Sequence, residues 1–191
     1  MSKKKIIVIV GLVAFVIIVG VLTWYIFNGG SSSTTTDSTG ISSTEKSPSA
    51  STKDIAAFIS GIDNLSKFNK LLVATGVNDT LKLTGTKYIV LAPNNDAFKA
   101  LPSGYYDSLL TADKKTIATD IVKYHYAIFT TDQLTNGQRL KTAEGQEVIV
   151  SVTGGKYYFT SAKGDKASVV KSAQKASNGT LYIIDTVLLP Q

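Results

Sequence analysis

ASNGTLYIIDTVLLP, residues 176–190, is the stretch that decides the fold. The turn signal Ser177-Asn178-Gly179 leads into an apolar run over residues 180–189 that is rich in β-branched side chains. Such a run, bounded by a turn and a proline, predicts a buried strand. A second run of this kind, residues 87–93, ends at Pro93. It predicts another strand, buried on both faces.

Apolar residues recur with helical spacing around the second run. Ser51 or Thr52 can cap a helix over residues 54–60, which Gly61 ends. The next helix ends before Gly76 and is predicted to bury Leu65, Phe68, Leu71 and Leu72. A third helix is predicted from Thr111 to about Lys123, with inward-facing Ile117, Ile121 and Val122.

The spacing changes from helical to alternating after Arg139. Glu147–Thr153 places Val148, Val150 and Val152 on one face. Gly154-Gly155 then predicts a hairpin turn, and Lys156–Thr160 returns as a strand with aromatic side chains. Helices early in the chain and strands late predict an α+β domain, a small sheet or sandwich flanked by helices.

Composition excludes several kinds of chemistry. The 191 residues include no Cys and one His, His125. Thiolate nucleophiles, disulfides, iron–sulfur clusters and multi-histidine metal sites are therefore excluded. No G-x-S-x-G elbow, G-x-G-x-x-G loop or Walker loop is present. We expect no catalytic residue, no cofactor and no metal site.

Residues 6–27 form an unbroken apolar run in which Thr23 is the only polar side chain. As a helix the run would span roughly 33 Å, enough to cross a bilayer. Lys3-Lys4-Lys5 precede the run, and Trp24-Tyr25 lie near its end. We therefore expect residues 1–5 in the cytoplasm and the residues after 27 outside the cell membrane. This predicts a single-pass plasma-membrane protein whose domain lies at the cell surface or in the periplasm. The alternative is a cleaved signal peptide, which would give a secreted domain.

Residues 28–52 contain 15 Ser and Thr among 25 positions and cannot bury a core. They predict a flexible stalk of roughly 25–30 Å average reach. Residues 53–191 remain as one domain. This domain carries 16 Lys and Arg against 12 Asp and Glu, with interspersed signs and a single Arg. Without a basic stripe, nucleic acid is not an expected partner.

Three stretches taken together resemble the fasciclin-type (FAS1) domain family. Residues 88–98, YIVLAPNNDAF, resemble its first signature, an apolar strand followed by A-P-(T/N)-(N/D)-x-A-F. Residues 123–126, KYHY, resemble its central Y-H element, and residues 176–190 resemble its closing signature. The resemblance implies a β-sandwich or wedge with flanking helices, found in cell-surface and secreted adhesion proteins.

The resemblance also implies a site of contact. The family's Y-H element has been proposed to touch a cell receptor, which would place an adhesion contact at Tyr124, His125 and Tyr126. A second proposed contact, an acidic residue paired with isoleucine, is not matched, because the equivalent residues 170–173 read VKSA. We therefore expect a membrane-anchored module that contacts a cell-surface or matrix protein, a polysaccharide, or a second copy of itself.

Other interpretations remain open. His125 is the only imidazole, so an anchored envelope hydrolase would have to use it. A structural role is the competing interpretation, because a histidine between two tyrosines at a helix end usually satisfies partners inside the fold. A regulatory ectodomain of a membrane complex is a third possibility. An alternative contact surface is formed by exposed tyrosines, namely Tyr105, Tyr106, Tyr157 and Tyr158.

Several polar residues have an ordinary structural interpretation. Asn94, Asn95 and Asp96 follow Pro93, where capping of a helical turn favours them over metal binding. Asp185 lies inside the predicted last strand, where a paired structural carboxylate is expected. Three triplets fit N-x-(S/T), a pattern that matters only in a glycosylating host, and they begin at Asn64, Asn78 and Asn178.

Overall fold

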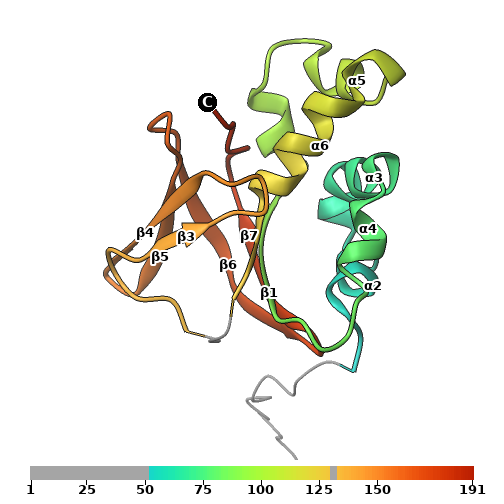
Figure 1. Ribbon diagram of the computed structural model, residues 1–191. Helices are drawn as coiled ribbons and strands as arrows, with labels where there is room; N and C mark the ends of the chain where they lie inside the picture. The colour runs from blue at the N-terminus through green and yellow to red at the C-terminus, as the bar shows by residue number, and fades with distance from the viewer. Residues whose placement is uncertain (1–51, 130–132) are drawn as a thin grey trace, which may run out of the picture. The chain divides into compact units, whose positions relative to one another are not determined.

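A computed structural model describes residues 52–129 and 133–191 (Figure 1). The predicted cytoplasmic segment 1–5, the anchor 6–27 and all but the last residue of the predicted stalk 28–52 lie outside the described residues, and they stay predictions. Among the described residues, no helix combines the length and the apolar character that crossing a bilayer would require.

Short helices and one strand make up the first half of the domain. Asp54 caps the first of them through its side chain, which accepts a hydrogen bond from the Ala57 N–H at 2.7 Å. The predicted caps, Ser51 and Thr52, are therefore wrong by two to three residues. The helical segments are α2 (Ile55–Ser60), η1 (Asp63–Leu65), α3 (Ser66–Thr75), α4 (Val77–Thr80), η2 (Ala97–Ala100), α5 (Tyr105–Leu109), η3 (Ala112–Lys114) and α6 (Lys115–Tyr124).

Seven strands form one mixed sheet in the order β2-β1-β7-β6-β5-β4-β3. All neighbouring pairs are antiparallel except β1 and β7, which run parallel next to the edge strand β2, with Val90 opposite Leu181. The strands are β1 (Tyr88–Pro93), β2 (Tyr126–Ile128), β3 (Arg139–Lys141), β4 (Glu147–Thr153), β5 (Lys156–Thr160), β6 (Lys166–Ala176) and β7 (Gly179–Ile184).

The long strand β6 belongs to both halves of the sheet. Its first residues pair with β5, its later residues pair with β7, and register shifts after Val169 and Lys171 bend it between the two. The far ends of the sheet also meet, because the Ala143 N–H donates to the Tyr126 carbonyl at 2.9 Å. The sheet is thus a wedge close to a barrel, which confirms the predicted α+β class.

Two hydrophobic cores lie on opposite faces of β1 and β7. Val90 and Ile183 point to the first core, which the helices cover, whereas Ile89 and Ile184 point into the second core inside the wedge. Figure 1 shows the helices on one side of these two strands and β3, β4 and β5 on the other. The prediction that residues 87–93 are buried on both faces is confirmed for the strand.

Four details of the predicted elements are wrong. The third helix splits into η3 and α6, and Ile117, expected inside, is 42% exposed. The last strand ends at Ile184 instead of reaching Leu189. Asp185 is therefore exposed, and its carboxylate accepts a hydrogen bond from the Ser168 N–H at 2.8 Å instead of pairing with a charge inside the strand.

Candidate binding site

His125 is completely buried, with 0% exposure, directly after α6. Its Nδ1 lies 2.8 Å from the Ile121 carbonyl, and its Nε2 accepts a hydrogen bond from the Leu188 N–H at 3.1 Å. A backbone N–H can only donate, so Nε2 is the acceptor and Nδ1 carries the proton. Burial lowers the pKa of His125 to about 4, against a smaller opposing effect of the hydrogen bond to Ile121. The imidazole is neutral and holds the fold together.

Tyr124 and Tyr126, the sequence neighbours of His125, are also buried, Tyr124 in the second core and Tyr126 in the first. The Tyr124 hydroxyl donates to the Glu147 carbonyl at 3.2 Å and accepts from the Ala162 N–H at 3.0 Å. Burial raises the pKa of both tyrosines. Their side chains belong to the two cores, so the contact expected at Tyr124, His125 and Tyr126 is not on the surface of this fold.

The four tyrosines of the alternative surface lie at different places. Tyr106 lines a pocket beside α3, and Tyr105 lines another near the carboxyl-terminal residues. Tyr157 packs against the wedge core, while Tyr158 on the opposite face of β5 lies under the Lys166 ammonium at 4.4 Å from the ring centroid. The four tyrosines do not form one contact surface. Of the four, Tyr106 lines the pocket of largest volume, which is described next.

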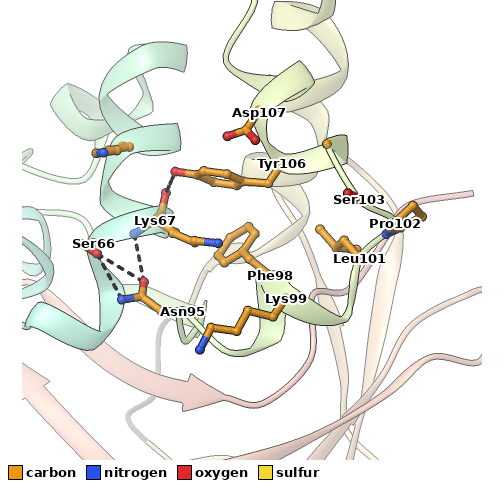
Figure 2. Close-up of a pocket in the computed structure, with 12 residues that line it drawn as sticks. Ser66, Lys67, Asn95, Phe98, Lys99, Leu101, Pro102, Ser103, Tyr106 and Asp107 are labelled. Carbon is orange, nitrogen blue, oxygen red and sulfur yellow. Dashed lines mark hydrogen bonds between the residues drawn. The ribbon is translucent and has the colours of Figure 1, made fainter.

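The pocket around Tyr106 has a volume of about 690 Å³ and lies between α3, η2 and α5. Ser66, Lys67 and Lys70 come from α3, whereas Asn95 and the segment 98–99 come from η2 and the turn before it. Residues 101–104 and the start of α5 complete the lining. Figure 2 shows the Lys67 side chain reaching toward the rings of Phe98 and Tyr106.

Asn94 and Asn95 hold this corner together. Asn94 accepts a hydrogen bond from the Ala97 N–H at 2.7 Å, which confirms the predicted capping of the turn. Asn95 serves a different helix, because its Oδ1 accepts from the Lys67 N–H at 3.0 Å and its Nδ2 donates to the Asp63 carbonyl at 3.0 Å. Both asparagines therefore have structural partners. The described residues contain no cluster of three or more metal-ligating side chains.

Two aromatic rings form one wall of the pocket. Phe98 and Tyr106 meet edge to face with centroids 5.2 Å apart. The Tyr106 hydroxyl donates to the Lys67 carbonyl at 3.1 Å, and the Lys67 ammonium lies 4.8 Å from the Tyr106 ring centroid. Burial and, to a lesser extent, Asp107 raise the pKa of Tyr106. The ring is thus fixed in place and stays a neutral phenol.

The pocket is positively charged. Three lysines and one aspartate line it. Lys99 pairs with Asp96 at 2.6 Å, but both side chains are about 70% exposed, so this ion pair is weak. The Lys70 ammonium has no hydrogen bond or ion pair with any residue that the structure describes. The arrangement suits a ligand that carries negative charge.

The closing stretch has a structural role. Asn178 is buried, and its Oδ1 accepts from the Ile55 N–H at 2.8 Å while its Nδ2 donates to the Leu81 and Leu83 carbonyls. At Gly179, a Cβ would overlap the Tyr88 carbonyl oxygen. Asn178 therefore cannot carry a glycan in this fold, whereas Asn64 is exposed.

The family model described as the fasciclin domain matches residues 63–190, about two thirds of the chain. The chain belongs to the fasciclin domain family. The structure gives a reason for all three fasciclin signatures, because β1 and β7 are parallel neighbours and His125 ties the end of α6 to the segment after β7. The signatures pack against one another and build the centre of the domain.

Relatives of this fasciclin domain include bacterial and animal proteins. Protein sll1483 of Synechocystis is 34% identical over 64% of this chain and 67% of its own length. The immunogenic protein MPB70 of Mycobacterium bovis is 33% identical over 60% of this chain and 55% of its length. Human periostin is 26% identical over 71% of this chain, but the match covers 16% of periostin. This chain thus spans about half the length of the mycobacterial relative and much less of the animal one.

A solved structure shows the same fold. It is a FAS1 domain pair from the insect cell adhesion molecule fasciclin I, with a TM-score of 0.63 and 19% identity over 73% of this chain and 51% of that chain. At this identity the likeness establishes the fold.

The lysine pocket was missed by sequence reasoning. Its residues come from three separate stretches, 66–70, 95–99 and 101–107, and only the packing of α3 against η2 and α5 brings them together. The available signal was weak. Lys67 and Lys70 are three residues apart and thus share one helix face, but the same spacing is common on solvated helices.

Proposed function

We propose that this protein is an extracytoplasmic adhesion module. In this proposal residues 6–27 anchor it in the plasma membrane with residues 1–5 inside, and residues 28–52 hold the fasciclin domain away from the bilayer. The observation that carries the proposal is the family membership of residues 63–190. The solved relative, described as an insect cell adhesion molecule, supports it.

Binding fits the described surface better than catalysis. A hydrolase would need His125, whose two nitrogens are used by backbone groups and whose ring has no exposed atom. The surface offers a lysine pocket with a fixed aromatic wall, which suits recognition. The proposed partner is therefore a cell-surface or matrix component, or a second copy of the chain.

A single domain of this kind would bind weakly and gain strength from numbers. Many copies tethered to one surface raise the effective concentration for every later contact. A stalk of roughly 25–30 Å average reach lets neighbouring domains engage the same partner surface. Attachment should therefore rise more steeply than in proportion to the density of the protein.

The test is attachment of coated beads. The full-length chain is coupled to beads at a series of densities, and we expect bead clumping or attachment to host cells to appear above a threshold density. Beads coated with a protein of equal charge but unrelated fold are the control. If beads at every density stay dispersed and unattached, the adhesion proposal is wrong.

A further inference from the structure

We infer that the pocket between α3, η2 and α5 binds an acidic polysaccharide, with lysines holding its carboxylates and the half-buried Tyr106 ring contacting a sugar ring. This inference rests on the proposed adhesive function and names the partner's chemistry. The pocket volume of about 690 Å³ lies within the range of small-molecule binding sites.

The charges favour an anionic ligand. The Lys70 ammonium has no partner among the described residues, and the Lys67 ammonium lies against the Tyr106 ring. Lys99 can leave its exposed pairing with Asp96 at little cost. A carboxylate that enters the pocket would gain charge-assisted hydrogen bonds from flexible ammonium groups, which act as point charges.

The other lining groups favour a sugar over an acidic peptide. Ser103 is exposed and adds a hydroxyl to the lining that matches the hydroxyls of a saccharide, whereas Ser66 and Asn95 already hydrogen-bond to each other. Phe98 is buried, and its edge-to-face contact holds the half-buried Tyr106 ring in place, so packing a sugar against the accessible part of Tyr106 costs little entropy. An extended peptide usually adds to a free strand edge, and this pocket is built from helices and a loop.

The test measures binding of polygalacturonate to the full-length chain in mild detergent. The pocket variant carries Lys67→Gln, Lys70→Gln and Lys99→Gln. The matched control carries the same charge change at three exposed lysines outside this pocket, namely Lys141→Gln, Lys156→Gln and Lys163→Gln. We expect wild type and control to bind alike and the pocket variant to bind about tenfold more weakly or worse. Unchanged melting temperatures establish that both variants are folded.

Three outcomes would overturn the inference. Wild type that does not bind polygalacturonate would do so, as would equal losses in the pocket and control variants, which would indicate nonspecific charge attraction. Poly-glutamate that binds as well as polygalacturonate through the same lysines would replace the saccharide with an acidic peptide. Neutral dextran measures stacking without charge, and we expect it to bind at least tenfold more weakly than polygalacturonate.

The bead assay separates this inference from the proposed function. If beads coated with wild type and with the pocket variant adhere equally well but polygalacturonate does not bind, the adhesion proposal holds and the inference about the pocket is wrong. If polygalacturonate binds through the pocket lysines but the beads never adhere, the inference about the pocket holds and the adhesion proposal is wrong.

Discussion

The Leu188 N–H donates a hydrogen bond to Nε2 of His125 at 3.1 Å, across 63 residues of sequence. The other ring nitrogen bonds to the Ile121 carbonyl, and the ring packs against Phe68 with centroids 5.8 Å apart. A neutral imidazole therefore joins the end of α6 to the segment after β7. Protonation at Nε2 would break the bond to Leu188, because a protonated nitrogen cannot accept.

The first prediction is a loss of stability in mild acid. The pKa of His125 is about 4 in the fold and about 6.5 in the unfolded chain, so the unfolded state takes up the proton first as the pH falls. The free energy of unfolding should fall by up to about 1.4 kcal/mol per pH unit between pH 6.5 and 4, about 3 kcal/mol in all. Urea unfolding of residues 53–191 across this range measures it.

His125→Gln is the comparison for that experiment. This variant should be less stable than wild type at pH 7 but should lose less stability between pH 6.5 and 4, because it has no imidazole to protonate. Identical slopes in wild type and variant would show that His125 does not cause the acid sensitivity.

The second prediction concerns Gly179. In Gly179→Ala, the new Cβ would overlap the Tyr88 carbonyl oxygen, so the parallel pairing of β1 and β7 must be forced apart. We expect a loss of at least about 3 kcal/mol or failure to fold. Gly61→Ala is the matched control, because its Cβ would lie 3.6 Å from the nearest atom at an ordinary φ of −88°. If the Gly179→Ala variant is as stable as Gly61→Ala, the close approach of the Gly179 backbone to the Tyr88 carbonyl oxygen is refuted.

The third prediction concerns Asn178. Asn178→Ala removes one acceptor and two donor contacts that hold Ile55, Leu81 and Leu83 around a buried turn. We expect a loss of about 2–4 kcal/mol, because buried backbone groups are left without partners. Asn136→Ala, which removes one exposed hydrogen bond to Val152, should cost about 1 kcal/mol or less. Thermal melts of the two variants provide the comparison.

The fourth prediction separates structural from binding roles. Tyr124→Phe removes a hydroxyl that bonds to the backbone at Glu147 and Ala162 but leaves the surface unchanged. It should lower stability by about 1 kcal/mol and leave bead adhesion as in wild type. A folded Tyr124→Phe protein that has lost adhesion would return the contact to the Y-H element.

Much of the fold could be predicted from local pattern. The alternation of Val148 and Val150, the Gly154-Gly155 turn and the buried run before Pro93 each depend on side chains close in sequence, and all are confirmed. Ile117 fits the helical pattern yet is 42% exposed. The pattern predicts which face of α6 is apolar, but it does not predict how much of that face the neighbouring elements cover. The order of strands in the sheet is a tertiary property and left no local signal.

The site was harder to predict for the same reason. The Y-H element stood out because its residues are rare and adjacent, but the structure uses them to connect buried backbone groups. Lys67 and Lys99 are common surface residues, and they line one pocket only because Asn95 fixes the turn before η2 against the start of α3. Long-range packing thus decides both the buried and the exposed roles.

Bead attachment as a function of surface density tests the central claim most directly. Beads carrying the full-length chain should clump or attach to cells above a threshold density. The variant with glutamine at positions 67, 70 and 99 should require a higher density than the control altered at positions 141, 156 and 163. Dispersed, unattached wild-type beads at every density would contradict the claim that this fasciclin domain is an adhesion module.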